Sequence, residues 1–200
     1  MRKPLTIFCD IPDARASTVT GMAERPENLD DLDFLSFIDF AVDRTTSEIP
    51  EVDPKAMRLG LGLTRVASAM IYDLEAEVHR PSGWSWPGFR ILFVLWLAGP
   101  SDAKRVARLS GASRAAVSAL VNTLERDGLV HRRRSSTDRR AVELSLTEAG
   151  REVITDTYIR HNQREQTWAK ALTGPEQTIL IGLLEKLAQA ATGTDVHTRE

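Results

Sequence analysis

Residues 112–150 read ASRAAVSALVNTLERDGLVHRRRSSTDRRAVELSLTEAG, and their hydrophobic period changes halfway along. In the first half, apolar residues recur at helical spacing, namely Val117, Leu120 and Leu124. Ser113 is a favourable N-cap residue, and Gly128 is the kind of residue that ends a helix in a left-handed conformation. This half therefore predicts a helix over Arg114–Asp127.

After Gly128 the period falls to two, which is typical of short strands. We expect strands over Leu129–Arg134 and Ala141–Leu146, joined by a polar loop over 135–140. The second strand predicts an inward face and an outward face, with Val142, Leu144 and Leu146 inward and Glu143 and Ser145 outward.

Upstream of this stretch, Ser101 is expected to cap a short helix that ends near Leu109, and Gly111–Ala112 forms a tight turn. A helix, a glycine turn, a second helix and a basic hairpin make a winged helix-turn-helix. Longer helices are predicted on both sides, over Ala56–Arg80, Trp86–Leu97 (N-cap Ser85), Thr147–Leu172 and 174–191 (capping box Thr173–Glu176). The fold class is mainly α, with a two-stranded hairpin wing.

One face of the predicted helix 114–127 carries side chains that suit the major groove of DNA. Arg114, Ser118 and Asn122 stand at i, i+4 and i+8, with Ala115 beside them. Arginine pairs with guanine, asparagine with adenine, serine with several bases, and an alanine methyl contacts thymine. The alternative is an ordinary solvated helix face.

The hairpin concentrates positive charge on Arg132, Arg133, Arg134, Arg139 and Arg140. A projecting loop with arginines can enter the minor groove, and we expect Arg133, Arg139 and Arg140 to contact DNA there. Asp138 would be repelled by phosphate, so we expect it to hold an arginine in place and stabilise the wing, or to form the turn. Some of the arginines could serve solubility alone.

The net charge of −2 hides an uneven distribution of charge. Residues 101–151 hold 11 Lys/Arg against 6 Asp/Glu, whereas residues 1–56 hold 6 against 12. A locally basic segment is enough for phosphate contacts, since screening confines each charge to roughly 8–10 Å.

Several function classes are disfavoured by the sequence. Cys9 is the single cysteine, so an intramolecular disulfide is excluded, and no apolar run is long enough to span a bilayer. We expect a soluble cytoplasmic protein. There is no nucleophile elbow, phosphate-binding loop or metal-ligand spacing, so we predict that the protein is not an enzyme and uses no cofactor or metal.

The stretch Val106–Gly150 resembles the signature of MarR-type (multiple antibiotic resistance) regulators. The resemblance rests on Leu-Glu-x-x-Gly-Leu-Val after the second helix, Asp-Arg-Arg in the wing and Leu-Thr-x-x-Gly before the next helix. It implies that the first and the last two helices form an intertwined homodimer. It also implies that Arg114, Ser118 and Asn122 read bases, and that Asp138 and Arg140 belong to the wing motif.

The resemblance also suggests a domain organisation. We predict an N-terminal extension over 1–54, a helical dimerisation region over 55–98 and 147–191, a DNA-binding region over 99–146 and a tail over 192–200. Within the extension, an acidic amphipathic helix over Leu29–Asp43 is followed by a linker over Thr45–Pro54. This acidic helix either packs on the dimerisation region or covers a basic surface in competition with DNA.

An aromatic group precedes the glycine turn and comprises Trp84, Trp86, Phe89, Arg90 and Phe93. Many members of the family that the sequence resembles are released from DNA by small aromatic acids bound near this position, and an arginine among aromatic rings suits such a carboxylate. The alternative is that these rings belong to the core. We therefore predict a repressor that leaves a pseudo-palindromic operator when a small aromatic effector binds. There are two competing hypotheses. One is a redox-responsive regulator that uses Cys9, and the other is an architectural DNA binder without an effector.

Overall fold

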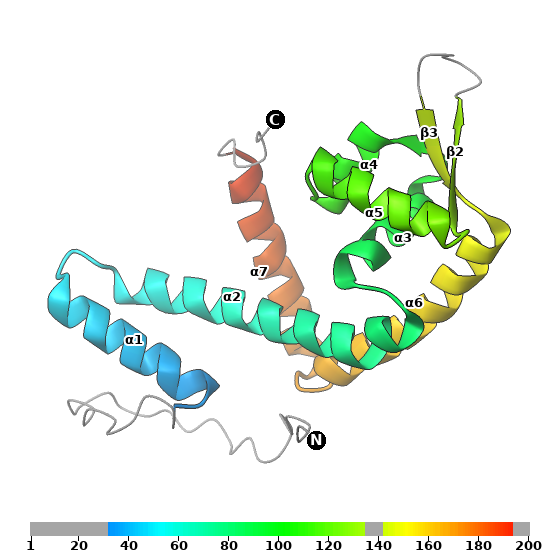
Figure 1. The fold of residues 1–200 in the computed structure, drawn as a ribbon. Helices are drawn as coiled ribbons and strands as arrows, with labels where there is room; N and C mark the ends of the chain where they lie inside the picture. Colours follow the sequence, from blue (N-terminus) through cyan, green and yellow to red (C-terminus); the bar gives the residue numbers. More distant parts are fainter. Residues whose placement is uncertain (1–31, 135–141, 194–200) are drawn as a thin grey trace. The chain divides into compact units, whose positions relative to one another are not determined.

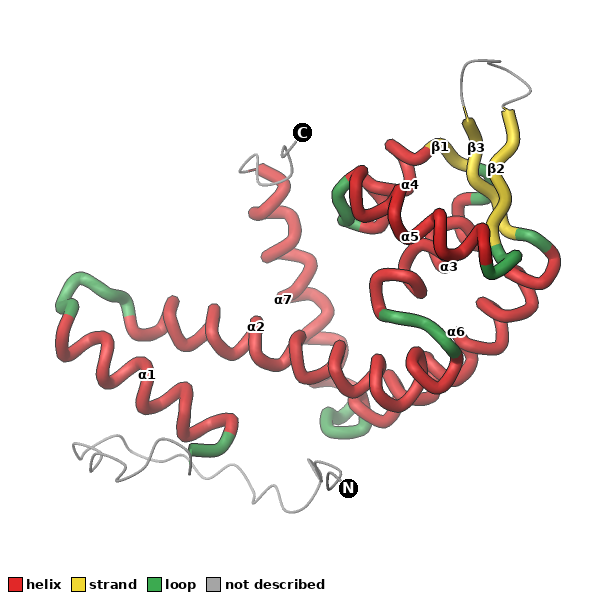
Figure 2. The backbone as a smooth tube through the Cα atoms, viewed as in Figure 1, coloured by secondary structure: helices red, strands yellow, loops and turns green. Residues whose placement is uncertain are grey.

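The computed structural model describes residues 32–134 and 142–193 (Figures 1 and 2). In chain order the elements are α1 Phe34–Glu48, α2 Pro54–Leu74, the π-helix η2 Glu75–His79, the 3-10 helix η3 Arg80–Ser82, α3 Trp86–Ala98, β1 Ser101–Asp102, α4 Ala103–Ser110, α5 Arg114–Arg126, β2 Val130–Arg134, β3 Val142–Leu146, α6 Glu148–Ala169 and α7 Gly174–Gly193. The chain divides into two units, residues 1–63 and 64–200, which are described separately.

The first unit contains α1 and the first part of α2. Asp33 caps α1, since its carboxylate accepts a hydrogen bond of 2.8 Å from the Ser36 amide. The predicted linker from Thr45 onward is wrong at its start, because α1 continues to Glu48. The hydroxyls of Thr46 and Ser47 donate to helical carbonyl oxygens one turn back, at 2.9 and 2.7 Å, so both polar residues are accommodated inside the helix.

The helical run predicted over Ala56–Arg80 is confirmed, but its geometry changes along the way. It begins at Pro54, passes from α to π geometry at Glu75 and ends in the 3-10 turn η3. Gly83 ends the run with a left-handed φ of 87°.

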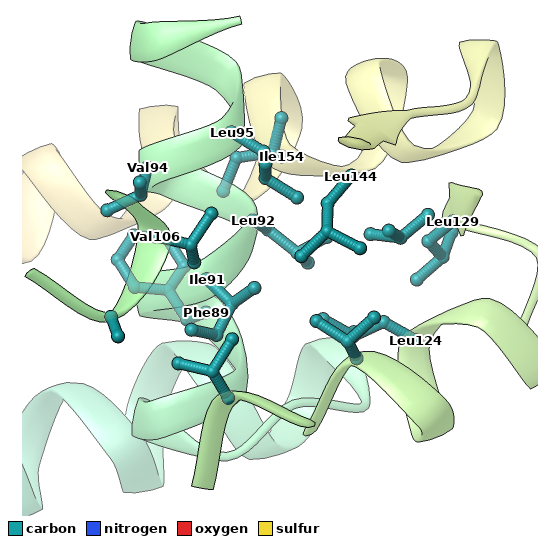
Figure 3. Packing of buried hydrophobic residues seen from close by; sticks show 14 residues of the cluster. Phe89, Ile91, Leu92, Val94, Leu95, Val106, Leu124, Leu129, Leu144 and Ile154 are labelled. Atoms are coloured by element: carbon teal, nitrogen blue, oxygen red, sulfur yellow. The ribbon is translucent and has the colours of Figure 1, made fainter. Parts of the chain in front are cut away.

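The core of the second unit lies between α3, α4, α5, the sheet and α6. Figure 3 shows Leu92 of α3 near Leu144 of β3, with Ile154 of α6 beside Leu95. Five core side chains have an exposed fraction of 0%, namely Ile91, Leu92, Val106, Val117 and Ile154. The helix-turn-helix and α6 therefore share one apolar core.

The wing hairpin is part of a three-stranded antiparallel sheet with strand order β1-β3-β2. Ser101, predicted as a helix cap, instead pairs with Leu144 in this sheet, and Asp102 caps α4 by accepting from the Arg105 amide at 2.7 Å. The inward position of Leu144 is confirmed by its exposure of 3%, but Val142 is 49% exposed and its predicted inward position is wrong. Val142 pairs with Arg134 at the far end of the ladder, beyond the core.

The other predicted caps are confirmed. Ser85, Ser113 and Thr147 each accept a hydrogen bond from the amide three residues on, at 3.2, 3.2 and 2.9 Å. In the capping box, the Glu176 carboxylate accepts from the Thr173 amide and hydroxyl, both at 2.7 Å.

A polar cluster joins the C-terminal part of α2 to α6. Asp73 pairs with Arg164, and it also accepts a hydrogen bond of 2.7 Å from the Trp168 indole. The Arg164 guanidinium holds the pKa of Asp73 below its ordinary value.

No helix in the described part of the chain is long and apolar enough to cross a membrane.

Candidate nucleic-acid interface and ligand cavities

The turn between α4 and α5 sets the position of the candidate recognition helix. Gly111 adopts a left-handed φ of 64°, and a Cβ built on it would lie 2.9 Å from Nη2 of Arg90. The left-handed backbone conformation therefore favours glycine at this turn, whereas the flexible end of the Arg90 side chain can shift.

Helix α5 has one buried side and one exposed side, as its sequence predicts. Val117, Val121 and Leu124 are at most 3% exposed and anchor the helix in the core. The predicted base-reading side chains all lie on the exposed side, namely Arg114, Ala115, Ser118 and Asn122. Three of these belong to the first two turns, where a recognition helix meets base edges.

Arg132 of β2, which the sequence indicates only as one of the basic residues of the hairpin, links α5 to the wing. Its Nη2 donates a hydrogen bond of 2.5 Å to Oδ1 of Asn122, and its Nε lies 3.5 Å from Oε2 of Glu125. This contact depends on how β2 lies against α5, which sequence spacing alone does not reveal. Arg133, the next residue, is exposed and points to the other face of the strand.

Four candidate residues lie outside the described ranges 32–134 and 142–193. They are Cys9, Asp138, Arg139 and Arg140. Their predicted roles stay predictions.

The predicted effector residues divide between the core and its margin. Phe89 is 2% exposed and stacks on the ring of His79 at 4.3 Å. Trp86 stacks on the same histidine at 5.4 Å, and Phe93 stacks on Tyr158 at 5.0 Å. Phe89 is therefore a core side chain, whereas Trp86 and Phe93 are half-buried around it.

Within this aromatic group, two histidines that are far apart in sequence form a buried pair. Nε2 of His79 lies 3.0 Å from Nδ1 of His161, and Nε2 of His161 lies 3.1 Å from a carboxylate oxygen of Glu165. The carboxylate can only accept, so we assign the proton of His161 to Nε2 and the bridging proton to Nε2 of His79. Among the described residues, no group of three or more His, Cys, Asp or Glu could hold a metal ion.

Burial keeps both histidines neutral. Desolvation, together with the neighbouring His161, lowers the pKa of His79 to about 4. Burial also lowers the pKa of His161, and Glu165 opposes this shift. The pair is therefore an uncharged hydrogen-bonded contact between the end of η2 and α6 at neutral pH.

Arg90 is the cation of the predicted effector group. Its guanidinium carbon lies 5.9 Å from the centroid of the Trp86 ring, a cation–π distance. The residue is half-buried, and no ion pair joins it to a carboxylate within the described ranges. The Arg90 guanidinium therefore lies on an aromatic surface and has no carboxylate counter-ion among the described residues.

Two hollows are found among the described residues of the second unit. The first, of about 330 Å³, is lined by Ser82, Trp84, Glu152, Val153, Asp156, Thr157 and Arg160. The second, of about 280 Å³, lies between α5 and the sheet and is lined by Ala103, Val117, Ser118, Val121, Arg132, Val142 and Leu144. Trp84 is the one member of the predicted effector group that lines either of them.

Comparison with known proteins identifies the family. The model of the MarR family matches residues 84–142. The chain is 32% identical over 140 residues to the uncharacterized HTH-type transcriptional regulator YwaE of Bacillus subtilis, an alignment that covers 70% of this chain and 82% of YwaE.

Solved structures agree with this match. The PcaV transcriptional regulator of Streptomyces coelicolor, in complex with its natural ligand, has a TM-score of 0.60 and 26% identity, and the match covers 70% of this chain and 97% of PcaV. BpsR of Bordetella bronchiseptica, whose DNA binding is regulated by 6-hydroxynicotinic acid, has a TM-score of 0.60 and 21% identity, with 66% of this chain and 98% of BpsR covered. The chain belongs to the MarR family of winged helix-turn-helix transcriptional regulators.

Proposed function

We propose that this regulator is a homodimeric repressor that binds a pseudo-palindromic operator and is released by a small aromatic carboxylate. The observation that carries the proposal is the exposed face of α5, with Arg114, Ser118 and Asn122 beside the arginines of β2. Two copies of α5 related by a twofold axis would enter successive major grooves about 34–36 Å apart.

The apolar surface of α7 supports a dimer. Six large apolar side chains of this helix are at least 41% exposed, namely Ile179, Leu180, Ile181, Leu183, Leu184 and Leu187. An apolar surface of this extent in a soluble regulator calls for a protein partner, and a second copy of the chain is the partner that a twofold operator requires.

Replacing Arg114 with alanine is expected to weaken operator binding by about 10- to 100-fold, the loss typical of one bidentate base contact. The measurement is fluorescence anisotropy of the full chain on a labelled duplex from its own upstream region, with a scrambled duplex for comparison. The saturated complex should contain two chains per duplex.

A matched control for this experiment is Arg126→Ala, because Arg126 is also an exposed arginine of α5 but lies in its last turn. It should reduce binding far less than Arg114→Ala. Equal and steeply salt-dependent binding of native and scrambled duplexes would indicate phosphate contacts alone and contradict a specific repressor.

For the effector, Arg90 on the Trp86 ring supplies a cation and an aromatic surface in one place. The regulated DNA binding of BpsR gives the chemical class to test first. We expect an aromatic acid such as 6-hydroxynicotinic acid or 4-hydroxyphenylacetate to release the duplex, and Arg90→Gln to raise the concentration required by at least about 10-fold, because it removes a charge-assisted hydrogen bond.

The operator affinity of Arg90→Gln without effector is the internal control, and a large loss there would mean that the arginine supports the adjacent Gly111 turn instead. Release that is unchanged in Arg90→Gln would place the effector elsewhere. Release by peroxide that is lost in Cys9→Ser would favour the redox hypothesis.

A further inference from the structure

The hollow of about 330 Å³ beside Trp84 has walls from two elements of the second unit. One wall is the segment after η3, where the Trp84 amide donates a hydrogen bond of 2.9 Å to the carbonyl of His79. The other wall is the first half of α6, which contributes Val153 and Thr157. Backbone hydrogen bonds on both sides therefore fix the two walls.

Two buried polar atoms among the lining side chains lack a hydrogen-bond partner in the described part of the chain. They are Nε1 of Trp84 and Oγ1 of Thr157. Thr157 is 1% exposed, so its hydroxyl is removed from bulk water. Leaving such a buried polar group without a hydrogen bond costs about 1–3 kcal/mol of folding free energy. Two unpaired polar atoms in one hollow therefore indicate a ligand that forms the missing hydrogen bonds.

The remaining polar groups of the hollow define its charge. Ser82 is already engaged, because its hydroxyl donates to the carbonyl of Val78 at 2.6 Å. Arg160 pairs with Asp156 at 2.5 Å, so its charge is balanced within the hollow. Glu152 adds a further carboxylate, which gives the lining a net charge of −1 from two acids and one base. The net negative charge of the lining disfavours an anionic ligand, whereas the positive charge of Arg90 favours one.

We propose that this hollow is a second ligand site, which binds a small uncharged ring compound whose carbonyl or hydroxyl oxygen accepts a hydrogen bond from Nε1 of Trp84 and contacts the hydroxyl of Thr157. The indole nitrogen can only donate, so the ligand must present an acceptor to it. A volume of about 330 Å³ is at the lower end of ligand sites, which suits a single ring. The site is separate from the aromatic-acid site proposed at Arg90.

The test follows the indole N–H signals of the ¹⁵N-labelled full chain, which has four tryptophans. Trp84→Phe identifies the Trp84 signal by its disappearance. Benzamide is expected to shift that signal saturably, whereas benzoate, which has the same size but a negative charge, should bind at least about 10-fold more weakly. Benzoate that binds as tightly as benzamide, or benzamide that leaves the Trp84 signal in place, would overturn the proposal.

Thr157→Val separates ligand binding from packing, because it removes the hydroxyl and keeps the shape. We expect about 3- to 10-fold weaker benzamide binding, as for one neutral hydrogen bond, and a melting temperature equal to or above that of the parent. Thr155→Val is the matched control, since Thr155 is exposed on the same helix and donates to the carbonyl of Arg151. A Thr157→Val protein that melts lower and binds benzamide unchanged would show that the hydroxyl serves the fold. DNA plays no part in this readout, so the result is independent of the proposed repressor activity.

Discussion

Replacing Gly150 with alanine is expected to lower the free energy of unfolding by about 3 kcal/mol or more, at the upper end of the cost of overpacking. A Cβ on Gly150 would lie 2.1 Å from the carbonyl oxygen of Leu129 and 3.0 Å from its carbonyl carbon. That carbonyl cannot move away easily, because it accepts a hydrogen bond of 2.9 Å from the Thr147 amide. The first turn of α6 rests directly on the backbone where α5 passes into β2.

Urea unfolding at a fixed protein concentration measures this effect, since the stability of the proposed dimer would depend on concentration. The matched control is Gly62→Ala in α2, where a Cβ would meet no atom within 4 Å. Removing a helical glycine there should leave the stability unchanged or raise it by up to about 1 kcal/mol. Equal stabilities of the two variants would contradict the close approach at Gly150.

The second large effect is a loss of stability in mild acid. The pKa of His79 is about 4 in the folded chain and about 6.5 when unfolded, so between these values the unfolded chain takes up a proton that the folded chain does not. The contribution of the neutral His79 to the free energy of unfolding is therefore fully present above pH 6.5 and falls as the pH drops toward 4. The loss from His79 alone amounts to about 3 kcal/mol, and the lowered pKa of His161 acts in the same direction.

Unfolding free energies at pH 7, 6 and 5 give the slope, and the imidazole NMR signals give the titration of His79 directly. His79→Phe, which keeps a ring between Trp86 and Phe89, should reduce the slope even though it loses the hydrogen bond to His161. An imidazole signal of His79 that titrates near pH 6.5 in the folded protein would refute this explanation.

The parts of the fold that the sequence predicts well are those in which cause and effect lie within one helical turn. Ser85, Ser113, Thr147 and Thr173 each cap a helix through a group three residues away. The family signature additionally predicts the order of the helices and the presence of the wing. The cap predicted at Ser101 is wrong because the partner of Ser101 in the sheet, Leu144, is distant in sequence, and a serine before a helix looks the same whether it caps or pairs.

In the candidate site, too, the sequence predicts local features but not contacts between residues that are distant along the chain. The exposed face of α5 follows from helical periodicity, so its side chains were predictable. The contact between His79 and His161 joins residues 82 positions apart, and the contact between Asn122 and Arg132 joins a helix to a strand. Each depends on tertiary packing, and no local pattern marks either residue as the partner of the other.

The hydrogen bond from Arg132 to Asn122 also bears on the proposed reading of bases by α5. With one lone pair of its oxygen engaged by Arg132, the amide of Asn122 keeps its two N–H groups and one further lone pair for a base edge. In the proposed complex, the paired contact to adenine uses both ends of the amide and must share the oxygen with Arg132, whereas guanine O6 and N7, adenine N7 and thymine O4 need only the N–H groups. We therefore expect Arg132 of β2 to influence how strictly the proposed operator position facing Asn122 is read.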